Sequence, residues 1–166
     1  MTLIFTETFD AYAGTGLAPV AQTTPSTGTL NSTVWLITGM SDAQPGYGGT
    51  VGAGDYGRGI LSASGNTTTG GMYAAPVGAG RGLAFQPSGT DFFEGTSNVT
   101  LRLANTSGAA WTGITVDFNW IYRNNDTRSD VMNFSWSTDG VTFTTISALQ
   151  LTTPVAADST SFTSIT

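Results

Sequence analysis

The sequence predicts an all-β protein, an antiparallel β-sandwich with Greek-key or jelly-roll connections. Apolar residues recur at every second position along residues 114–122, as they do in a strand that buries one face. The 22 glycines and 30 threonines make a composition rich in turn formers and strand formers. No segment sustains the period of a helix. At 166 residues the chain is long enough to bury a core, so we expect residues 1–166 to form a single domain.

The beginning of the chain predicts two strands joined by a long connection. Residues 3–9 alternate apolar and polar side chains and so predict a first strand. Residues 11–32 are rich in Ala, Gly, Pro, Ser and Thr without any period, which predicts an irregular connection. Residues 34–38 predict the next strand, and Trp35 and Ile37 are expected to point inward.

The connection from residue 39 to residue 59 is the first candidate for a functional site. At about 20 residues it is far longer than most loops, and loops of this length are often functional. Its candidate ligand-binding residues are Tyr47, Tyr56, Arg58, Asp42 and Asp55, which offer flat rings and hydrogen-bonding groups suited to a sugar. The same residues could instead anchor the loop to the sheet, because tyrosines commonly pack their rings while the hydroxyl forms a hydrogen bond.

Further strands are predicted through the rest of the chain. Alternation and turn signals place them at residues 60–64, 72–77, 82–86, 98–105, 114–122 and 132–136. Leu83 and Phe85 share an inward face. The dipeptide Asp139-Gly140 tolerates positive backbone dihedrals and predicts a tight hairpin turn after the last of these strands.

The composition excludes most catalytic chemistry. Lysine, histidine and cysteine are absent, so the chain has no His-dependent triad, thiol nucleophile, Schiff base or His/Cys zinc site. The only glutamates, Glu7 and Glu94, lie in unrelated contexts and do not form a glycosidase pair. We therefore expect that the protein is not an enzyme. A net charge of −6 argues against nucleic acid as a ligand, and no apolar run is long enough to predict a membrane span.

Two groups of oxygen ligands suit a structural calcium ion. Glu7 falls on the apolar side of the first predicted strand, near Asp10 in the sequence. The alternative for Glu7 is a rim position or an arginine partner, because an unpaired buried charge is costly. The second group gathers its oxygen ligands within seven residues, in the loop between two predicted strands: Asn124, Asn125, Asp126 and Asp130. There the alternative is that Asn and Asp act as turn formers, with two neighbouring arginines competing for the carboxylates.

Asparagine is concentrated in N-x-Ser/Thr sequons. Six of the eight asparagines begin one: Asn31, Asn66, Asn98, Asn105, Asn125 and Asn133. Roughly two would be expected by chance, so the excess indicates a Thr-rich exposed surface or glycan attachment.

The order of motifs resembles a known extracellular module. ETFDAY begins at Glu7, VWLITGMSD at Val34, GDYGRG at Gly54, GGMYAAPVGAGRGLAFQPSGTDF at Gly70, LRLANTSG at Leu101, and FNWIYRNNDTRSDVMNFSWSTDGVTF at Phe118. This order is similar to a bacterial β-sandwich module of large secreted proteins, itself similar to concanavalin-like and carbohydrate-binding jelly rolls. The resemblance implies an extracellular or cell-surface location, in adhesins or before lamin-tail, nuclease or phosphoesterase domains. Such modules end in further strands with an Asp-rich motif, so this chain is expected to lack the last strands of the sandwich.

These observations predict a non-catalytic extracellular module for surface adhesion or carbohydrate contact, with a polysaccharide or cell-surface glycan as its partner. One alternative is a structural subunit that assembles with copies of itself into a fibre, sheath or layer through strand exchange. An unpaired sheet edge is a template for another chain, and the lysine-free surface lacks charges that discourage such pairing. Another alternative is an accessory domain of a secreted phosphoesterase or nuclease. We expect the secretion signal to lie outside this sequence.

Overall fold

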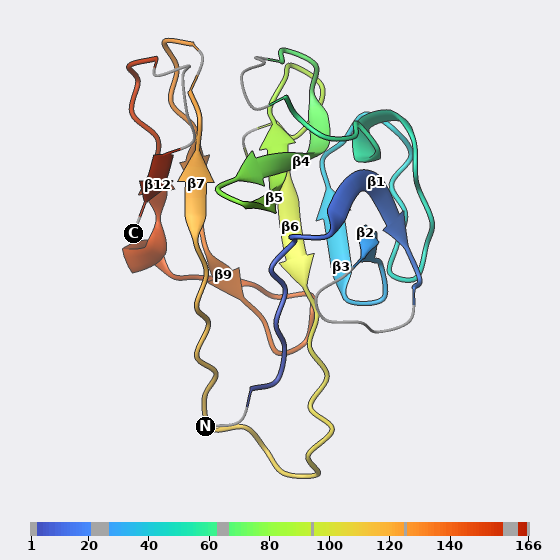
Figure 1. The fold of residues 1–166 in the computed structure, drawn as a ribbon. Coiled ribbons are helices and arrows are strands. Elements are labelled where there is room, and N and C mark those ends of the chain that lie inside the picture. Colours follow the sequence, from blue (N-terminus) through green and yellow to red (C-terminus); the bar gives the residue numbers. More distant parts are fainter. Residues whose placement is uncertain are drawn as a thin grey trace. The chain divides into compact units, whose positions relative to one another are not determined.

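The computed structural model describes residues 3–20, 27–62, 67–93, 95–124, 126–157 and 163–165, and it shows an all-β protein (Figure 1). The helical segments in these residues are two 3-10 turns, η1 (Gly54–Tyr56) and η2 (Ser147–Leu149). None of the helices in this part of the chain has the length and apolar character that a bilayer crossing requires. The chain forms two compact units, unit 1 (Met1–Ala110) and unit 2 (Trp111–Thr166). The single domain of residues 1–166 stays a prediction.

The described residues of unit 1 contain three two-stranded sheets. They pair β1 (Tyr12–Ala18) with β2 (Gly28–Asn31) in parallel, and pair β3 (Trp35–Thr38) with β6 (Asn98–Leu101) and β4 (Gly71–Val77) with β5 (Gly80–Gln86) antiparallel. The last pair is a hairpin (Figure 1). Two isolated bridges, Leu17 to Val51 and Ile60 to Ala74, connect the long loops to β1 and β4.

The core of unit 1 is formed where these sheets meet. Its buried residues come from the first four strands and from η1: Tyr12, Leu17, Leu30, Trp35, Ile37, Tyr56, Met72 and Ala74. Phe5 packs edge-on against Trp35, with ring centroids 6.1 Å apart, and Phe9 packs against the same ring at 5.7 Å. Removal of these apolar groups from water stabilises the unit.

The first 32 residues differ from the prediction. Residues 3–9 form no strand, although Phe5 and Phe9 still pack on the core. The supposedly irregular stretch 11–32 contains β1 and β2. Gly14, within β1, has a positive φ of 69°, and a Cβ there would lie 2.0 Å from the Gly59 carbonyl oxygen. Glycine in this strand therefore permits close approach of another backbone segment. A glycine-rich composition is also typical of irregular loops, so it could not predict this strand.

The other strand predictions for unit 1 are largely confirmed. β3 lies where it was expected, with Trp35 and Ile37 buried, and β4 and β5 begin within two residues of their predicted positions. Leu83 and Phe85 pack against the core while remaining half-buried. Of the strand predicted at residues 60–64, only a bridge at Ile60 forms, and residues 63–64 lie outside the described residues. The strand predicted at residues 98–105 ends at Leu101.

Unit 2 consists of short antiparallel pairs. They join β7 (Trp120–Tyr122) to β12 (Thr163–Ile165), β8 (Val131–Met132) to β11 (Leu151–Thr152), and β9 (Ser135–Trp136) to β10 (Thr144–Thr145). The predicted hairpin at Asp139-Gly140 is confirmed as the connection between β9 and β10, although the turn spans residues 137–143 and is not tight. Gly140 has the expected positive φ, 72°. The Asp139 Oδ1 atom accepts hydrogen bonds from the backbone N–H groups of Val141 and Thr142, each at 2.8 Å.

The strand predicted at residues 114–122 forms only at its end. Ile114, Val116 and Phe118, which share the apolar face of the pattern, are 53%, 54% and 48% exposed, so the prediction of a buried face is wrong. Among the described residues, residues 112–119 form no backbone–backbone hydrogen bond. A buried face requires a neighbouring strand and a facing layer. The alternation of apolar and polar residues predicts neither of them.

Candidate functional site

Asp55 forms hydrogen bonds that connect the two ends of the long loop at residues 39–59. It lies in η1 and is only 4% exposed. Its Oδ2 atom accepts hydrogen bonds from the Ser41 hydroxyl at 2.7 Å and from the Asp42 backbone N–H at 2.9 Å. A second hydrogen bond joins the same two residues, because the Asp42 Oδ2 atom accepts the Asp55 N–H at 2.8 Å. A Cβ on Gly54 would lie 1.8 Å from that Asp42 oxygen, so this close pairing requires glycine.

Arg58 neutralises the buried carboxylate. Its Nη2 atom forms an ion pair with Asp55 Oδ1, and its Nε atom donates to the Gly70 carbonyl oxygen at 3.0 Å. The Arg58 side chain is 29% exposed. The arginine therefore joins η1 to the residues just before β4. Breaking a partly buried pair of this kind is strongly destabilising, because it leaves a charge without its partner.

Asp91, which the sequence interpretation did not single out, is a second buried carboxylate beside Ser41. Its Oδ1 atom accepts the Ser41 N–H at 3.0 Å, and its Oδ2 atom accepts the hydroxyls of Ser88 at 3.0 Å and Thr90 at 3.1 Å. Burial alone would raise the pKa of Asp91, but hydrogen bonds, from Ser41 first and then from Ser88 and Asp55, lower it to about 2. Ser41 thus donates to both buried carboxylates.

Only part of this arrangement had a signal in the sequence. The Ser88-Gly-Thr-Asp91 stretch has the composition of a polar turn, and the Ser88 hydroxyl does accept the Asp91 N–H at 3.0 Å. The bond from Ser41 to Asp91 spans 50 positions and had no such signal. The group formed by Ser41, Asp42, Asp55, Arg58 and Asp91, which we call the carboxylate network, is therefore a product of the tertiary fold.

Tyr56 and Tyr47, the two tyrosines of the loop, have different environments. Tyr56 is fully buried, and its hydroxyl donates to the Ile37 carbonyl oxygen at 3.2 Å, as the anchoring interpretation expected. Burial first, and then the charges of Asp55 and Asp42, raise the pKa of Tyr56 to about 12. Tyr47 is half-buried at the surface. It is therefore the tyrosine of this loop that a ligand can reach.

Arg102, also missed by the sequence interpretation, stacks on Tyr47. Its guanidinium carbon lies 3.9 Å from the centroid of the Tyr47 ring, within the range of a cation–π interaction. Burial raises the pKa of Tyr47, and the charge of Arg102 opposes that rise. The Arg102 Nη2 atom donates to the Thr33 carbonyl oxygen at 2.7 Å, which holds the stacked geometry. We call Tyr47 and Arg102 the stacked pair.

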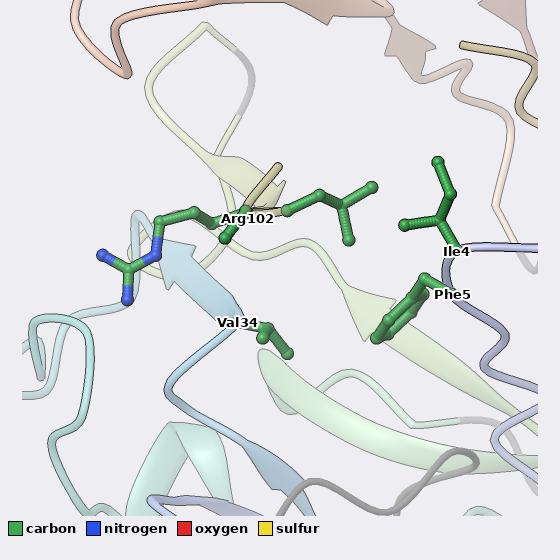
Figure 2. Close-up of a pocket in the computed structure, with 6 residues that line it drawn as sticks. Ile4, Phe5, Val34 and Arg102 are labelled. Atoms are coloured by element: carbon green, nitrogen blue, oxygen red, sulfur yellow. The ribbon is translucent and has the colours of Figure 1, made fainter. Parts of the chain in front are cut away.

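Arg102 also lines a groove of about 260 Å³ in unit 1 (Figure 2). The groove is lined by Ile4, Phe5, Val34, Arg102, Leu103 and Ala104. Figure 2 shows Phe5 and Ile4 on one side, whereas the guanidinium of Arg102 points away from them. The groove is thus lined mainly by apolar residues, and the charge of Arg102 is directed away from Ile4 and Phe5.

The two N-terminal calcium candidates have polar contacts within unit 1. Glu7 Oε1 accepts the N–H of Phe9 at 2.9 Å, which caps a turn in which Phe9 has a positive φ of 59°. Asp10 Oδ1 lies against the β4–β5 turn and accepts the Arg81 N–H at 3.4 Å. A Cβ on Gly80 would lie 2.0 Å from that Asp10 oxygen. Glu7 is therefore held by the turn before β1, whereas Asp10 is held by the backbone at the start of β5.

The three calcium candidates of unit 2 that the structure describes lie in polar turns. The Asn124 side-chain amide donates to the carbonyl oxygens of Arg128 at 2.6 Å and Pro154 at 2.8 Å. Asp126 pairs with Arg128 at 3.2 Å on the surface, and the Asp130 N–H donates to a threonine hydroxyl. Asn125, in the same loop, lies outside the described residues, as do Glu94 and Asn66. In the part of the chain that is described, no three His, Cys, Asp or Glu side chains group as they would around a metal ion.

The chain matches no protein-family model, no curated protein and no solved structure.

Proposed function

We propose that this chain is a non-catalytic extracellular module for surface adhesion or carbohydrate contact, folded as an antiparallel sandwich of jelly-roll type. The observation that carries the proposal is the stacked pair. The half-buried ring of Tyr47 offers an apolar surface to a sugar. The guanidinium of Arg102 carries five N–H donors, and its bond to the Thr33 carbonyl oxygen leaves others to bond a sugar hydroxyl. Flat rings beside convergent polar groups suit sugar binding. The partner would be a polysaccharide or a cell-surface glycan.

The carboxylate network supports a non-catalytic role. A general acid or base must come within hydrogen-bond reach of the substrate. Asp55 and Asp91 are 4% and 5% exposed, and their oxygens accept hydrogen bonds from neighbouring serines, threonine and arginine. These carboxylates therefore stabilise the loop that carries Tyr47. A role as an accessory domain of a secreted phosphoesterase or nuclease, the alternative that the resemblance implies, is compatible with this use.

A glycan array followed by calorimetry, with and without calcium, tests the proposal. We expect a polysaccharide to bind and Arg102→Ala to weaken that binding by about tenfold or more, because a hydrogen bond from a charged guanidinium to a sugar hydroxyl contributes about 1.5 kcal/mol or more. Arg128→Ala is the matched control, because Arg128 is an exposed arginine in unit 2 that pairs with Asp126. Equal effects of the two substitutions would contradict a site at the stacked pair. Hydrolase activity together with no polysaccharide binding in either calcium state would overturn the proposal.

A second candidate, self-assembly into an extracellular fibre, sheath or layer, is favoured by residues 114–118. Their apolar side chains are about half exposed, and their backbone groups form no bonds to other described backbone groups. Such a segment can pair with a strand of another copy. Light scattering after size-exclusion chromatography, with negative-stain microscopy, tests this candidate. We expect Val116→Asp to abolish any assembly and Val141→Asp, at the exposed tip of the β9–β10 hairpin, to leave it unchanged. A clean monomer at high concentration would eliminate it.

A further inference from the structure

Four of the six sequons lie within the described residues, and they differ in environment. Asn31 is 1% exposed, so its amide is inaccessible in the folded protein. Asn98 begins β6 in extended backbone, and its Nδ2 atom contacts the Thr38 hydroxyl at 3.4 Å. Asn133 is exposed, but its Oδ1 atom accepts the Gln150 amide at 2.7 Å. Asn105 is exposed, as are the residues around it.

The side chain of Asn105 is bonded within its own sequon. Its Oδ1 atom accepts the Ser107 N–H at 3.0 Å and is the nearer acceptor of the Ser107 hydroxyl, at 2.7 Å against 3.0 Å for the Ala109 carbonyl oxygen. One N–H of the amide donates to the Ala109 carbonyl oxygen at 2.7 Å, and the amide carries a second N–H. This is an Asx turn in the loop that follows β6, the yellow segment of Figure 1.

We propose that Asn105 is a site of N-glycan attachment, selected among the sequons by exposure and by this turn. A hydrogen bond from the Ser107 hydroxyl to the amide oxygen withdraws electron density from the carboxamide and makes the Nδ2 proton more acidic. The co-substrate is a sugar carried as a lipid-linked glycosyl diphosphate. The Nδ2–C1 bond forms while the bond from C1 to the diphosphate oxygen breaks, the lipid diphosphate leaves with the bonding electrons, and the Nδ2 proton passes to a base of the transferase.

Asn31 is the internal comparison for this proposal. Its Oδ1 atom accepts the Thr33 N–H at 3.0 Å and contacts the Thr33 hydroxyl at 2.8 Å, nearly the geometry of Asn105. Asn31 therefore has the turn but is buried. Asn98 is exposed but lies in a strand, and Asn133 is exposed but its amide oxygen bonds to Gln150. Asn105 combines both features. Glycosylation in the source organism rests on the proposed extracellular location. The ability of the folded chain to accept a glycan in vitro does not depend on that location.

The experiment uses purified folded protein, a single-subunit oligosaccharyltransferase and a lipid-linked oligosaccharide donor. Asn66 and Asn125 are replaced by Gln in every sample, so that the four described sequons are compared. Peptide mapping by mass spectrometry locates the glycan. We expect one glycan on the folded chain, at Asn105, and its complete loss in Asn105→Gln and in Ser107→Ala. Free peptides that span each of the four sequons serve as unfolded controls.

Every outcome bears on the proposal. Modification of the Asn31 peptide but not of Asn31 in the folded chain would support selection by exposure. Modification of folded Asn98 or Asn133 in preference to Asn105 would overturn selection by the turn. An unmodified folded Asn105 would overturn the proposal whether or not its peptide is accepted. Glycan-array binding is measured on unmodified protein, so failure here is distinguishable from failure of the proposed function.

Discussion

The two units of this protein bury their apolar residues to very different degrees. All the buried apolar residues identified among the described residues lie in unit 1, between Tyr12 and Ala75. Among residues 111–124 and 126–157 of unit 2 no residue is buried, and Trp136 is 52% exposed. Period-two alternation of apolar residues occurs in both units. The difference teaches that alternation predicts a strand face, whereas burial of that face depends on neighbours distant in the sequence.

The units also use carboxylates differently. In unit 1, Asp55 and Asp91 are buried and bond to Ser41 across long sequence separations. In unit 2, Asp139 is exposed and bonds within its own turn. A network of buried groups stabilises the whole unit, because each group left unpaired costs free energy. An exposed turn carboxylate determines local geometry instead.

The largest expected effect is the loss of the buried carboxylate of Asp55. Asp55→Ala leaves Arg58 and the Ser41 hydroxyl without their partner and is expected to lower the free energy of unfolding of unit 1 by about 3 kcal/mol. Amide hydrogen exchange in β3 under urea measures it. Asp117→Ala, an exposed carboxylate in unit 2, is the control, with an expected change within about 0.5 kcal/mol. Equal protection losses in the two variants would remove the distinction between the units.

A matched pair of isoleucines tests the comparison directly. Ile37 is 1% exposed and Ile114 is 53% exposed. Ile37→Ala is expected to lower the free energy of unfolding by about 2 kcal/mol or more, because it removes buried methyl groups and leaves a cavity. Ile114→Ala is expected to change it by less than about 0.5 kcal/mol. Urea denaturation of both variants measures the difference. A large loss in Ile114→Ala would show that the alternating face of unit 2 is buried after all.

Acid is expected to weaken the two units through carboxylates whose pKa is lowered. The pKa of Asp91 is about 2 in the folded protein, below an unfolded value of about 3.9. Its contribution to stability is therefore complete above about pH 4 and is lost as the pH falls toward 2. Urea midpoints of wild type and Asp91→Asn are expected to differ at pH 6 and to converge near pH 2. A constant difference across this range would contradict the lowered pKa of Asp91.

In unit 2 the lowered pKa of Asp139 is expected to affect only the turn that contains this residue. Backbone hydrogen bonds from Thr142 and Val141 hold the pKa of Asp139 well below its usual range. Protonation is therefore expected to weaken these bonds only in strong acid. The NMR shifts of the Val141 and Thr142 amides report this titration, and Asp139→Asn is expected to abolish it. A titration of these two amides near the ordinary value for aspartate would show that the turn bonds do not form.

A smaller effect is expected at Gly140. Its φ of 72° is left-handed, and a Cβ there would contact nothing, so the strain of Gly140→Ala is purely conformational. The cost is expected to be about 1 kcal/mol, seen as weaker β9–β10 cross-strand NMR contacts. Gly113→Ala is the control, since Gly113 has equal space and no positive φ. Identical spectra for both variants would mean that the turn does not require glycine.

The smallest expected effect separates the two calcium candidates. Millimolar calcium is expected to stabilise the fold by about 1 kcal/mol at most, the mass-action gain for a weak extracellular site. Melting temperatures in calcium and in chelator measure the change. Loss of the effect in Glu7→Gln with Asp10→Asn would place the ion in unit 1. Loss in Asp126→Asn with Asp130→Asn would place it in unit 2, beside Asn124. No change in wild type would exclude both.

The features predicted correctly are those whose causes are close together in the chain. β3, with Trp35 and Ile37 inward, follows from its own alternation. The hairpin after β9 follows from Asp139 and Gly140, since every bond of the turn lies within a few residues. Turn chemistry and side-chain period act locally, so the sequence by itself determines them.

The tertiary structure alone decided the features that depend on distant segments. β1 forms because its glycines admit the backbone near Val51 and Gly59, although its composition is that of a loop. Asp91 meets Ser41 fifty positions away, and Arg102 meets Tyr47 at a separation of half the length of unit 1. The apolar face at residues 114–118 stays exposed because burial requires a partner that no local pattern supplies. Alternation and turn residues act between near neighbours in the chain, whereas burial and ion pairing depend on which segments the fold brings together.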